Sequence, residues 1–326
     1  MIFLSKKRAT VALLSLLWAA ADATAQTAAF PTRPISLVVP FSAGGGTDLV
    51  ARIIAPHMEK TLGQPVLVEN RPGANANLAG AFVAKSKPDG YTILYNTSSM
   101  TINPAVYRNP GYDVLKDLAP VGLSVSIPTG LLVAPAVPAK SMAEFIAYAR
   151  ANPGKLSYGS SGVGNINHMA ALQFTLSHNI DAVHVPYKGS APAIIDLSAN
   201  RIQFMIDTVN AVTGFLRDGR LRLIAVATPK RLAIYPDVPT FAEAGISGAQ
   251  GGAWSGMMVP AQTPQPIIAT LNAALMAALQ APEVRQRLAD QGTEVLGSTP
   301  AEYGAFLRKE LARWALVAKE AGVVPE

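Results

Sequence analysis

Short apolar runs alternate with segments of helical spacing in the first third of the chain. The run Ile35–Val39 is continuously apolar, as in a strand buried on both faces. Val50, Ile53 and Ile54 recur instead at the spacing of an amphipathic helix. The pattern predicts alternating strands and helices over Ile35–Val39, Asp48–Leu62, Val66–Glu69, Leu78–Lys85 and Tyr91–Asn96. Such βαβ alternation with short loops is typical of a parallel, doubly wound sheet.

A second alternating region follows residues 121–138, where prolines interrupt several apolar runs. Ser141 and Glu144 have the spacing of a capping box and predict the start of a helix that runs through Arg150. The strands and helices expected next are Leu156–Gly159, Ile166–Ser177, Val183–Val185, Ala191–Leu197, Ile202–Ile206, Val212–Arg217 and Leu221–Ala227. This region therefore predicts a second lobe of the same class.

The C-terminal part is mostly helical, with a return strand before it. Trp254–Val259 is apolar and is expected to cross back to the first lobe. The elements expected after it are Pro266–Leu279, Pro282–Gln291, a short strand Glu294–Leu296 and a closing helix Pro300–Glu320. We expect an α/β protein of two lobes, each a doubly wound, mostly parallel sheet flanked by helices. The expected lobes are residues 26–127 plus 252–326, and residues 128–251.

The N-terminus has the pattern of an export signal. Lys6, Lys7 and Arg8 precede an apolar segment, Val11–Ala21, that is short for a membrane span. Ala23-Thr24-Ala25 fits a small-residue cleavage site. Residues 1–25 are therefore predicted to be a signal peptide, cleaved after about Ala25, and the mature chain is expected in the periplasm. The alternative is an uncleaved N-terminal anchor.

Composition excludes several classes of function. The chain has no Cys, which rules out thiol chemistry and disulfides, and its 4 His residues include no pair with zinc-site spacing. The formal net charge is +6, but the basic residues are scattered and not clustered with aromatic residues. We therefore expect no metal, no cofactor and no binding of nucleic acid.

Two glycine-containing loops have the geometry of anion sites. Val38-Val39-Pro40-Phe41-Ser42-Ala43-Gly44-Gly45-Gly46-Thr47-Asp48 places three glycines between a strand and a helix. A helix that begins there directs free backbone N–H groups and a positive dipole at a ligand. The loop lacks the lysine of a nucleotide-binding P-loop. Ser160–Asn165 repeats the arrangement in the second lobe. Two such helix N-termini facing one cleft would hold an anion, or the two ends of a dianion.

A hydrolase is the alternative that these residues suggest. A nucleophile elbow requires Gly-x-Ser-x-Gly, but Gly159-Ser160-Ser161-Gly162-Val163 has its second glycine one position early. His168 could serve as a base for Ser161, although it lies well inside the following helix. A histidine that anchors the loop or contacts a ligand is the simpler interpretation, and no catalytic residue is assigned.

Motifs spread over the whole mature chain resemble one family. These motifs are Val39-Pro40-Phe41-Ser42-Ala43-Gly44-Gly45, Val68-Glu69-Asn70-Arg71-Pro72-Gly73-Ala74, Pro88-Asp89-Gly90-Tyr91-Thr92, His184-Val185-Pro186-Tyr187-Lys188-Gly189-Ser190 and Pro236-Asp237-Val238-Pro239-Thr240. The chain resembles the periplasmic substrate-binding proteins of tripartite tricarboxylate transporters, the Bug-type receptors. The resemblance implies a type II periplasmic-binding-protein fold, a two-lobed Venus flytrap. It also implies a small carboxylate ligand, membrane transporter subunits as partners, and a monomer.

The resemblance also implies a set of ligand-binding residues. The first loop would hold a carboxylate largely through backbone N–H groups and bridging waters, without a buried arginine, while Asp48 braces the loop. Asp207 is either a hydrogen-bond acceptor for a ligand ammonium or hydroxyl group, or a structural turn residue. A ligand sensor that docks to a signalling partner remains an alternative function. The expected ligand-binding residues are Phe41, Ser42, Ala43, Gly44, Gly45, Ser98, Ser160, Ser161, Gly162, His168, Tyr187, Lys188 and Asp207, with Thr97, Ser99 and Gly189 beside them.

Overall fold

The computed structural model describes residues 30–246, 252–320 and 325, so the predicted signal peptide lies outside the described residues. In the described part of the chain the strands form two sheets. The first has the order β11-β4-β10-β3-β1-β2. Its strands are β1 (Ile35–Val39), β2 (Val66–Asn70), β3 (Thr92–Thr97), β4 (Leu118–Ile127), β10 (Ala253–Pro260) and β11 (Glu294–Val295).

The second sheet has the order β7-β6-β8-β5-β9. Its strands are β5 (Thr129–Val133), β6 (Leu156–Ser160), β7 (Ala182–Pro186), β8 (Phe204–Thr208) and β9 (Arg222–Val226). The chain passes from the first sheet to the second at Pro128, between β4 and β5, and returns with β10. The expected return strand at Trp254–Val259 is thus confirmed, since β10 pairs with both β3 and β4.

The expectation of mostly parallel sheets is wrong, because both sheets are mixed. β1 is parallel to β2 and β3, and β6 is parallel to β7 and β8. The strands at the two passages between the sheets are antiparallel to their neighbours, namely β10 against β3 and β4, and β5 against β8 and β9. A strand that enters a sheet from the other lobe has no βαβ crossover to fix its direction, so the local alternation did not predict it.

Except for one helix at Ser99–Val106, which the sequence pattern did not predict, the helices follow the expected ranges within a few residues. Those connected with the first sheet are α2 (Gly46–Leu62), α3 (Asn77–Ala84), α4 (Ser99–Val106), α9 (Gln265–Gln280), α10 (Pro282–Ala289) and α11 (Pro300–Glu320), with a 3₁₀ turn η2 (Ala74–Ala76). Those of the second are α5 (Met142–Arg150), α6 (Ile166–Ser177), α7 (Ser190–Ser198) and α8 (Thr213–Arg217), with η3 (Val209–Ala211). Ser141 caps α5 as expected, since its Oγ accepts from the Glu144 N–H at 3.3 Å.

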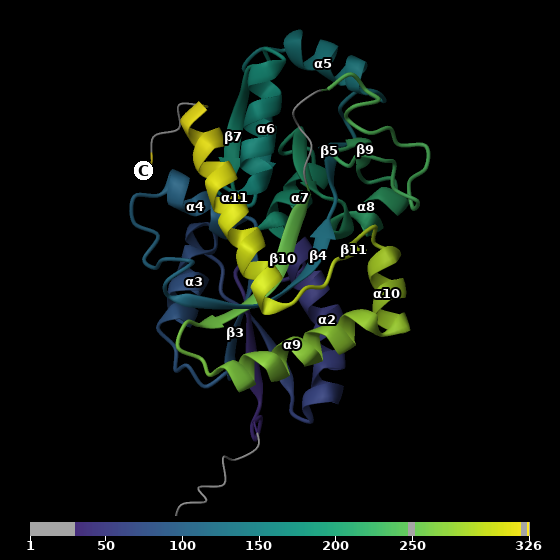
Figure 1. Ribbon diagram of the computed structural model, residues 1–326. Helices are drawn as coiled ribbons and strands as arrows, with labels where there is room; N and C mark the ends of the chain where they lie inside the picture. The colour runs from purple at the N-terminus through teal and green to yellow at the C-terminus, as the bar shows by residue number, and fades with distance from the viewer. Residues whose placement is uncertain (1–29, 247–251, 321–324, 326) are drawn as a thin grey trace, which may run out of the picture. The chain divides into compact units, whose positions relative to one another are not determined.

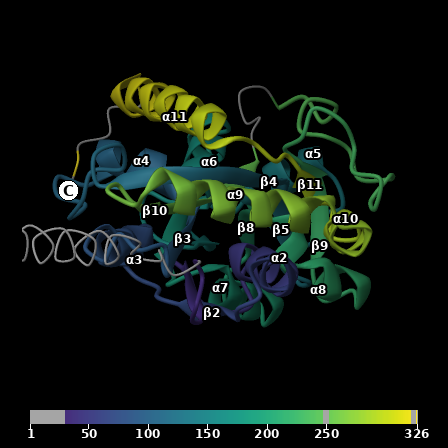
Figure 2. The ribbon, with the colours of Figure 1, turned by 60° about the horizontal axis from the view of Figure 1, so that its bottom comes forward.

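Each sheet has its own hydrophobic core. In the second, Phe145 packs between Phe174 and Phe204, with ring centroids 6.1 and 5.1 Å apart. In the first, α9 packs against α2, and α11 packs against α4 and β4 (Figures 1 and 2). In the described residues no single helix is long and apolar enough to cross a membrane; only α9 and α10 taken together would be, and they are bent by 66°.

A small third cluster joins elements of the two sheets. Trp314 of α11 packs with Ile102 and Val106 of α4 and with Met169 of α6. Asn210, beside β8, donates to the carbonyl of Gly46 at 3.0 Å, and Tyr107 donates to the carbonyl of Val163 at 2.8 Å. Helices and loops connected with the two sheets therefore contact each other directly.

Candidate functional site

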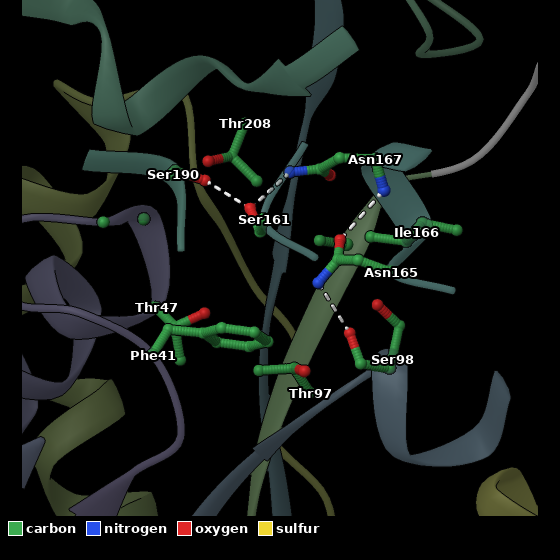
Figure 3. A pocket seen from close by; sticks show the side chains of 14 residues that line it. Phe41, Thr47, Thr97, Ser98, Ser161, Asn165, Ile166, Asn167, Ser190 and Thr208 are labelled. Atoms are coloured by element: carbon green, nitrogen blue, oxygen red, sulfur yellow. Dashed lines mark hydrogen bonds between the residues drawn. The ribbon is translucent and has the colours of Figure 1, made fainter. Parts of the chain in front are cut away.

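A cavity lies where the ends of β1, β3, β6 and β8 meet (Figure 3). The space there that protein atoms do not occupy, including the part open to solvent, is about 380 Å³. The residues that line it are Phe41, Gly45, Gly46, Thr47, Thr97, Ser98, Ser99, Ser161, Asn165, Ile166, Asn167, Ser190, Thr208 and Ala253. None of these described lining residues carries a charged side chain.

The cavity is formed by the N-terminal ends of four helices among those described. Gly46 and Thr47 begin α2, and Ser99 begins α4, both from the first sheet. Ile166 begins α6, and Ser190 begins α7, both from the second. No side chain caps α2, α4 or α7 by a hydrogen bond. Their first backbone N–H groups therefore remain available to a ligand, and their dipoles make the cavity positive without a cation.

Asp48, in the first turn of α2, holds the loop between β1 and α2 in place through hydrogen bonds. Its carboxylate accepts from the Gly44 N–H at 2.9 Å and from Arg52 Nε at 2.9 Å. Asn70 joins Asp48 to the carbonyl of Phe41, with hydrogen bonds of 2.9 and 3.0 Å. Burial alone would raise the pKa of Asp48, but the hydrogen bonds from Arg52, Gly44 and Asn70 hold this pKa below its usual value. Asp48 thus braces the loop as predicted, and it is not among the residues that line the cavity.

Several buried polar atoms around the cavity have no hydrogen-bond partner. They are Thr97 Oγ1, Ser98 Oγ, Asn167 Oδ1 and Thr208 Oγ1 among the lining residues, and Ser42 Oγ, Asp207 Oδ2 and Asn210 Oδ1 close to it. A buried polar group left unpaired costs about 1–3 kcal/mol. Such a concentration at one cavity is expected where a polar ligand or ordered water completes the hydrogen bonding.

The structure brings some of the predicted site residues to the cavity. Phe41, Gly45, Ser98 and Ser161 line it, as do Thr97 and Ser99. The side chain of Lys188 is exposed, and its backbone carbonyl accepts from the Ser42 N–H at 3.4 Å. Tyr187 donates its hydroxyl proton to Asp196 at 2.8 Å. The predicted residues that do not line the cavity are Ser42, Ala43, Gly44, Ser160, Gly162, His168, Tyr187, Lys188 and Asp207, so their ligand contacts stay predictions.

Ser161 and His168 do not have the contacts of a catalytic pair. Ser161 Oγ lies 2.9 Å from Ser190 Oγ and accepts from Asn167 Nδ2 at 3.1 Å. Nδ1 of His168 accepts from the Gly164 N–H at 3.2 Å, so this side chain anchors the loop before α6. His168 also stacks on His184, whose Nε2 lies 2.7 Å from Ser160 Oγ. Burial and the neighbouring His168 lower the pKa of His184 to about 4, so it is neutral near pH 7.

Sequence reasoning missed four lining residues of the second sheet's helices and strands. They are Ile166, Asn167, Ser190 and Thr208. Each stands at a helix start or a strand end, where parallel βα units place their ligand contacts. Their positions at helix starts and strand ends could have identified the polar ones as candidates, once the ends of the strands had been predicted.

A cavity between two α/β lobes, lined by helix N-termini, is the site of a solute-binding protein with the periplasmic-binding-protein fold. The family model described as tripartite tricarboxylate transporter family receptor matches residues 50–323. The chain belongs to this receptor family.

Three solved structures are similar over nearly their whole length. The periplasmic binding protein BugD is 35% identical, with a TM-score of 0.89, over 91% of this chain and 100% of that one. An R. palustris protein solved with adipate is 37% identical, with a TM-score of 0.88, over 91% and 100%. MatC from Rhodopseudomonas palustris, with bound malate, is 36% identical, with a TM-score of 0.84, over 89% and 100%.

Proposed function

We propose that this chain is a periplasmic receptor that captures a small organic carboxylate in the cavity and presents it to the membrane subunits of a tripartite tricarboxylate-type transporter. The observation that carries the proposal is the meeting of four helix N-termini, three of them uncapped, around a cavity with no charged described lining residue. Each such terminus stabilises an anion by about 0.3–1 kcal/mol when exposed, and by up to about 2 kcal/mol when partly buried.

Backbone recognition suits a receptor that is empty for part of its cycle. A buried arginine would be an unpaired charge whenever the ligand leaves, at a cost of several kcal/mol. Helix N–H groups carry only partial charge, and water satisfies them when the cavity opens. Two relatives at 36–37% identity were solved with adipate and malate, which supports a carboxylate as the ligand here.

The proposed mechanism is capture by closure of two lobes, residues 26–127 plus 252–326 and residues 128–251. In this mechanism the lobes open about the passages at Pro128 and before Ala253, and ligand binding shifts the population towards the closed form. The hydrogen bond from Asn210 to Gly46 joins the two sides in the closed form. We further propose that residues 1–25 are removed at export, and that the mature protein acts as a monomer without catalysis.

Thermal unfolding with a panel of carboxylates tests the proposal. A ligand that binds only the folded state, present at 100 times its Kd, stabilises it by about 2.7 kcal/mol and raises Tm by about 4–5 °C for a chain of this length. The matched controls are the neutral amides of the same acids, which should leave Tm unchanged. A panel of mono-, di- and tricarboxylates that leaves Tm unchanged at millimolar concentration would refute the proposed function.

A further inference from the structure

The two sides of the cavity offer different hydrogen-bonding groups. The first-lobe side offers the N–H groups at the starts of α2 and α4. The second-lobe side has the side chains of Ser161, Asn167, Ser190 and Thr208, which gather together in Figure 3. Directly behind them lies Asp207, at the end of β8 and fully buried. The direction of each hydrogen bond in this group can be assigned from Asp207.

Asp207 accepts three hydrogen bonds on a single oxygen. Its Oδ1 lies 2.7 Å from Asn167 Nδ2, 2.9 Å from Ser190 Oγ and 2.6 Å from the Thr208 N–H. Burial raises the pKa of Asp207 to about 6, although the hydrogen bonds from Thr208, Ser190 and Asn167 oppose the increase, so the group is ionised at pH 8. An ionised carboxylate only accepts, so Ser190 and Asn167 are the donors.

The remaining protons then follow by elimination. Ser190 donates its only hydroxyl proton to Asp207. In the 2.9 Å contact between the two serine hydroxyl groups, Ser161 is therefore the donor and Ser190 the acceptor. Ser161 in turn accepts from Asn167 Nδ2 at 3.1 Å. Both amide protons of Asn167 are therefore used, one on Asp207 and one on Ser161. The opposite amide orientation would set its oxygen against the Asp207 carboxylate at 2.7 Å, which electrostatic repulsion excludes.

Once these hydrogen bonds are made, two acceptor atoms of these side chains remain without a partner. Asn167 Oδ1 and Asp207 Oδ2 are buried and unpaired, and both residues are more than nine-tenths buried. Thr208 Oγ1 is also unpaired and can donate or accept. The side chains of Ser161, Ser190 and Asn167 have no proton left to offer a ligand. Beside the uncapped N–H groups of α7, the second-lobe side therefore presents buried side-chain acceptors without partners, whereas the first-lobe side offers the N–H groups of α2 and α4.

We propose that the second-lobe side of the cavity is an acceptor subsite for a donor group on the ligand. The ligand is then a small carboxylate that also carries an ammonium or hydroxyl group, an amino acid or a hydroxy acid, in preference to an unsubstituted dicarboxylate. The inference rests on the proposed function, since the carboxylate occupies the N–H groups of the first-lobe side. A second carboxylate beside Asn167 Oδ1 would find no side-chain proton from Ser161, Ser190 or Asn167 and would be repelled by Asp207.

Matched ligands that differ by one substituent test the proposal. Isothermal titration at pH 8 would compare succinate, malate and aspartate, then glutarate, 2-hydroxyglutarate and glutamate, then propionate, lactate and alanine. Within each series that binds, we expect the hydroxyl- or ammonium-bearing acid to bind at least about tenfold tighter, as expected for a buried acceptor that the unsubstituted acid leaves unpaired. An unsubstituted acid that binds within threefold of its substituted partners, or tighter, overturns the acceptor subsite while leaving carboxylate capture intact. Failure of all nine acids to bind would overturn this inference, and failure of the wider carboxylate panel as well would overturn the proposed function.

Asp207→Asn tests the role of the carboxylate. The amide keeps an acceptor and adds a donor, so we expect the preference for substituted acids to fall at least tenfold, while affinity for the unsubstituted acid stays the same or rises. Asp218→Asn is the matched control, since it removes the same charge from an exposed residue. Ser190→Ala is the second variant if Asp207→Asn does not fold. It frees the Ser161 proton to act as a donor and should also reduce the preference. Wild-type preference in a folded variant of either kind would contradict the proposal.

Discussion

Gly46 lines the cavity at a place where the two lobes approach each other closely. A Cβ atom at this position would lie 2.5 Å from Asn210 Oδ1 and 2.5 Å from Thr208 Oγ1, both on the opposite lobe. Gly46 is the first residue of α2, without a left-handed φ, so alanine fits its own backbone. Gly46→Ala therefore keeps the N–H group and its direction, but obstructs closure.

The expected loss follows from the cost of overpacking. Forcing one methyl group into a well-packed contact costs about 1–3 kcal/mol, which corresponds to about a 5-fold to 140-fold loss of affinity. Titration of Gly46→Ala with whichever of the nine acids binds the wild type most tightly should show this loss. The Tm of the ligand-free protein should fall by no more than about 2 °C, because the open form relieves the contact.

Two neighbouring substitutions serve as controls. At Gly45 a Cβ atom would meet Ser42 O at 3.5 Å and Ser190 Cβ at 3.8 Å, which are ordinary contacts, so Gly45→Ala should cost less. At Gly214 there is nothing within 4 Å, and Gly214→Ala should leave affinity unchanged. Wild-type affinity in Gly46→Ala would refute the proposed closure of the two lobes around the ligand at Gly46.

Three further predictions concern charge and packing. The raised pKa of Asp207 means that the folded state favours the protonated acid, so ionisation at pH 7 costs about 3 kcal/mol. This cost is relieved as pH falls through about 6 towards 3.8, the usual pKa of an aspartate, and urea unfolding at pH 7.5 and 5 should show the gain for wild type relative to Asp207→Asn. Lys188→Ala should change ligand affinity less than threefold in calorimetry, because its side chain is exposed and off the cavity; a tenfold loss would mean that a cation, not the backbone, binds the anion. Trp314→Ala should lower the free energy of unfolding by about 3–5 kcal/mol in denaturant titration, because the ring joins α4, α6 and α11; a loss below 1 kcal/mol would contradict this packing.

The order and extent of most helices and strands could be predicted, because they depend on hydrophobic spacing and capping residues that lie close together in the sequence. The helix Ile166–Ser177 begins and ends as its spacing indicates, and Ser141 caps its helix. Asn200 adopts the left-handed conformation, with φ 60°, that its turn requires. The direction of β10 and β5 could not be predicted, because it depends on how the chain passes between lobes.

Only part of the site could be predicted in the same way. The three consecutive glycines mark the first loop in the sequence, so Phe41 and Gly45 were correctly predicted to line the site. The partners of Asp207 are Asn167 and Ser190, 40 and 17 residues away, which only the sheet order brings together. Lys188 was expected at the ligand because of its motif. Its side chain is exposed and its backbone carbonyl accepts from the Ser42 N–H, so its contact with a ligand stays a prediction.

A crystal structure of the protein with its bound carboxylate tests the central claim most directly. Backbone recognition predicts carboxylate oxygens about 2.7–3.0 Å from N–H groups in the first turns of α2 and α4, or joined to them through one water molecule. It also predicts no lysine or arginine side chain in contact with the ligand. A carboxylate paired with a cationic side chain, or bound away from Gly46 and Ser99, would contradict the account.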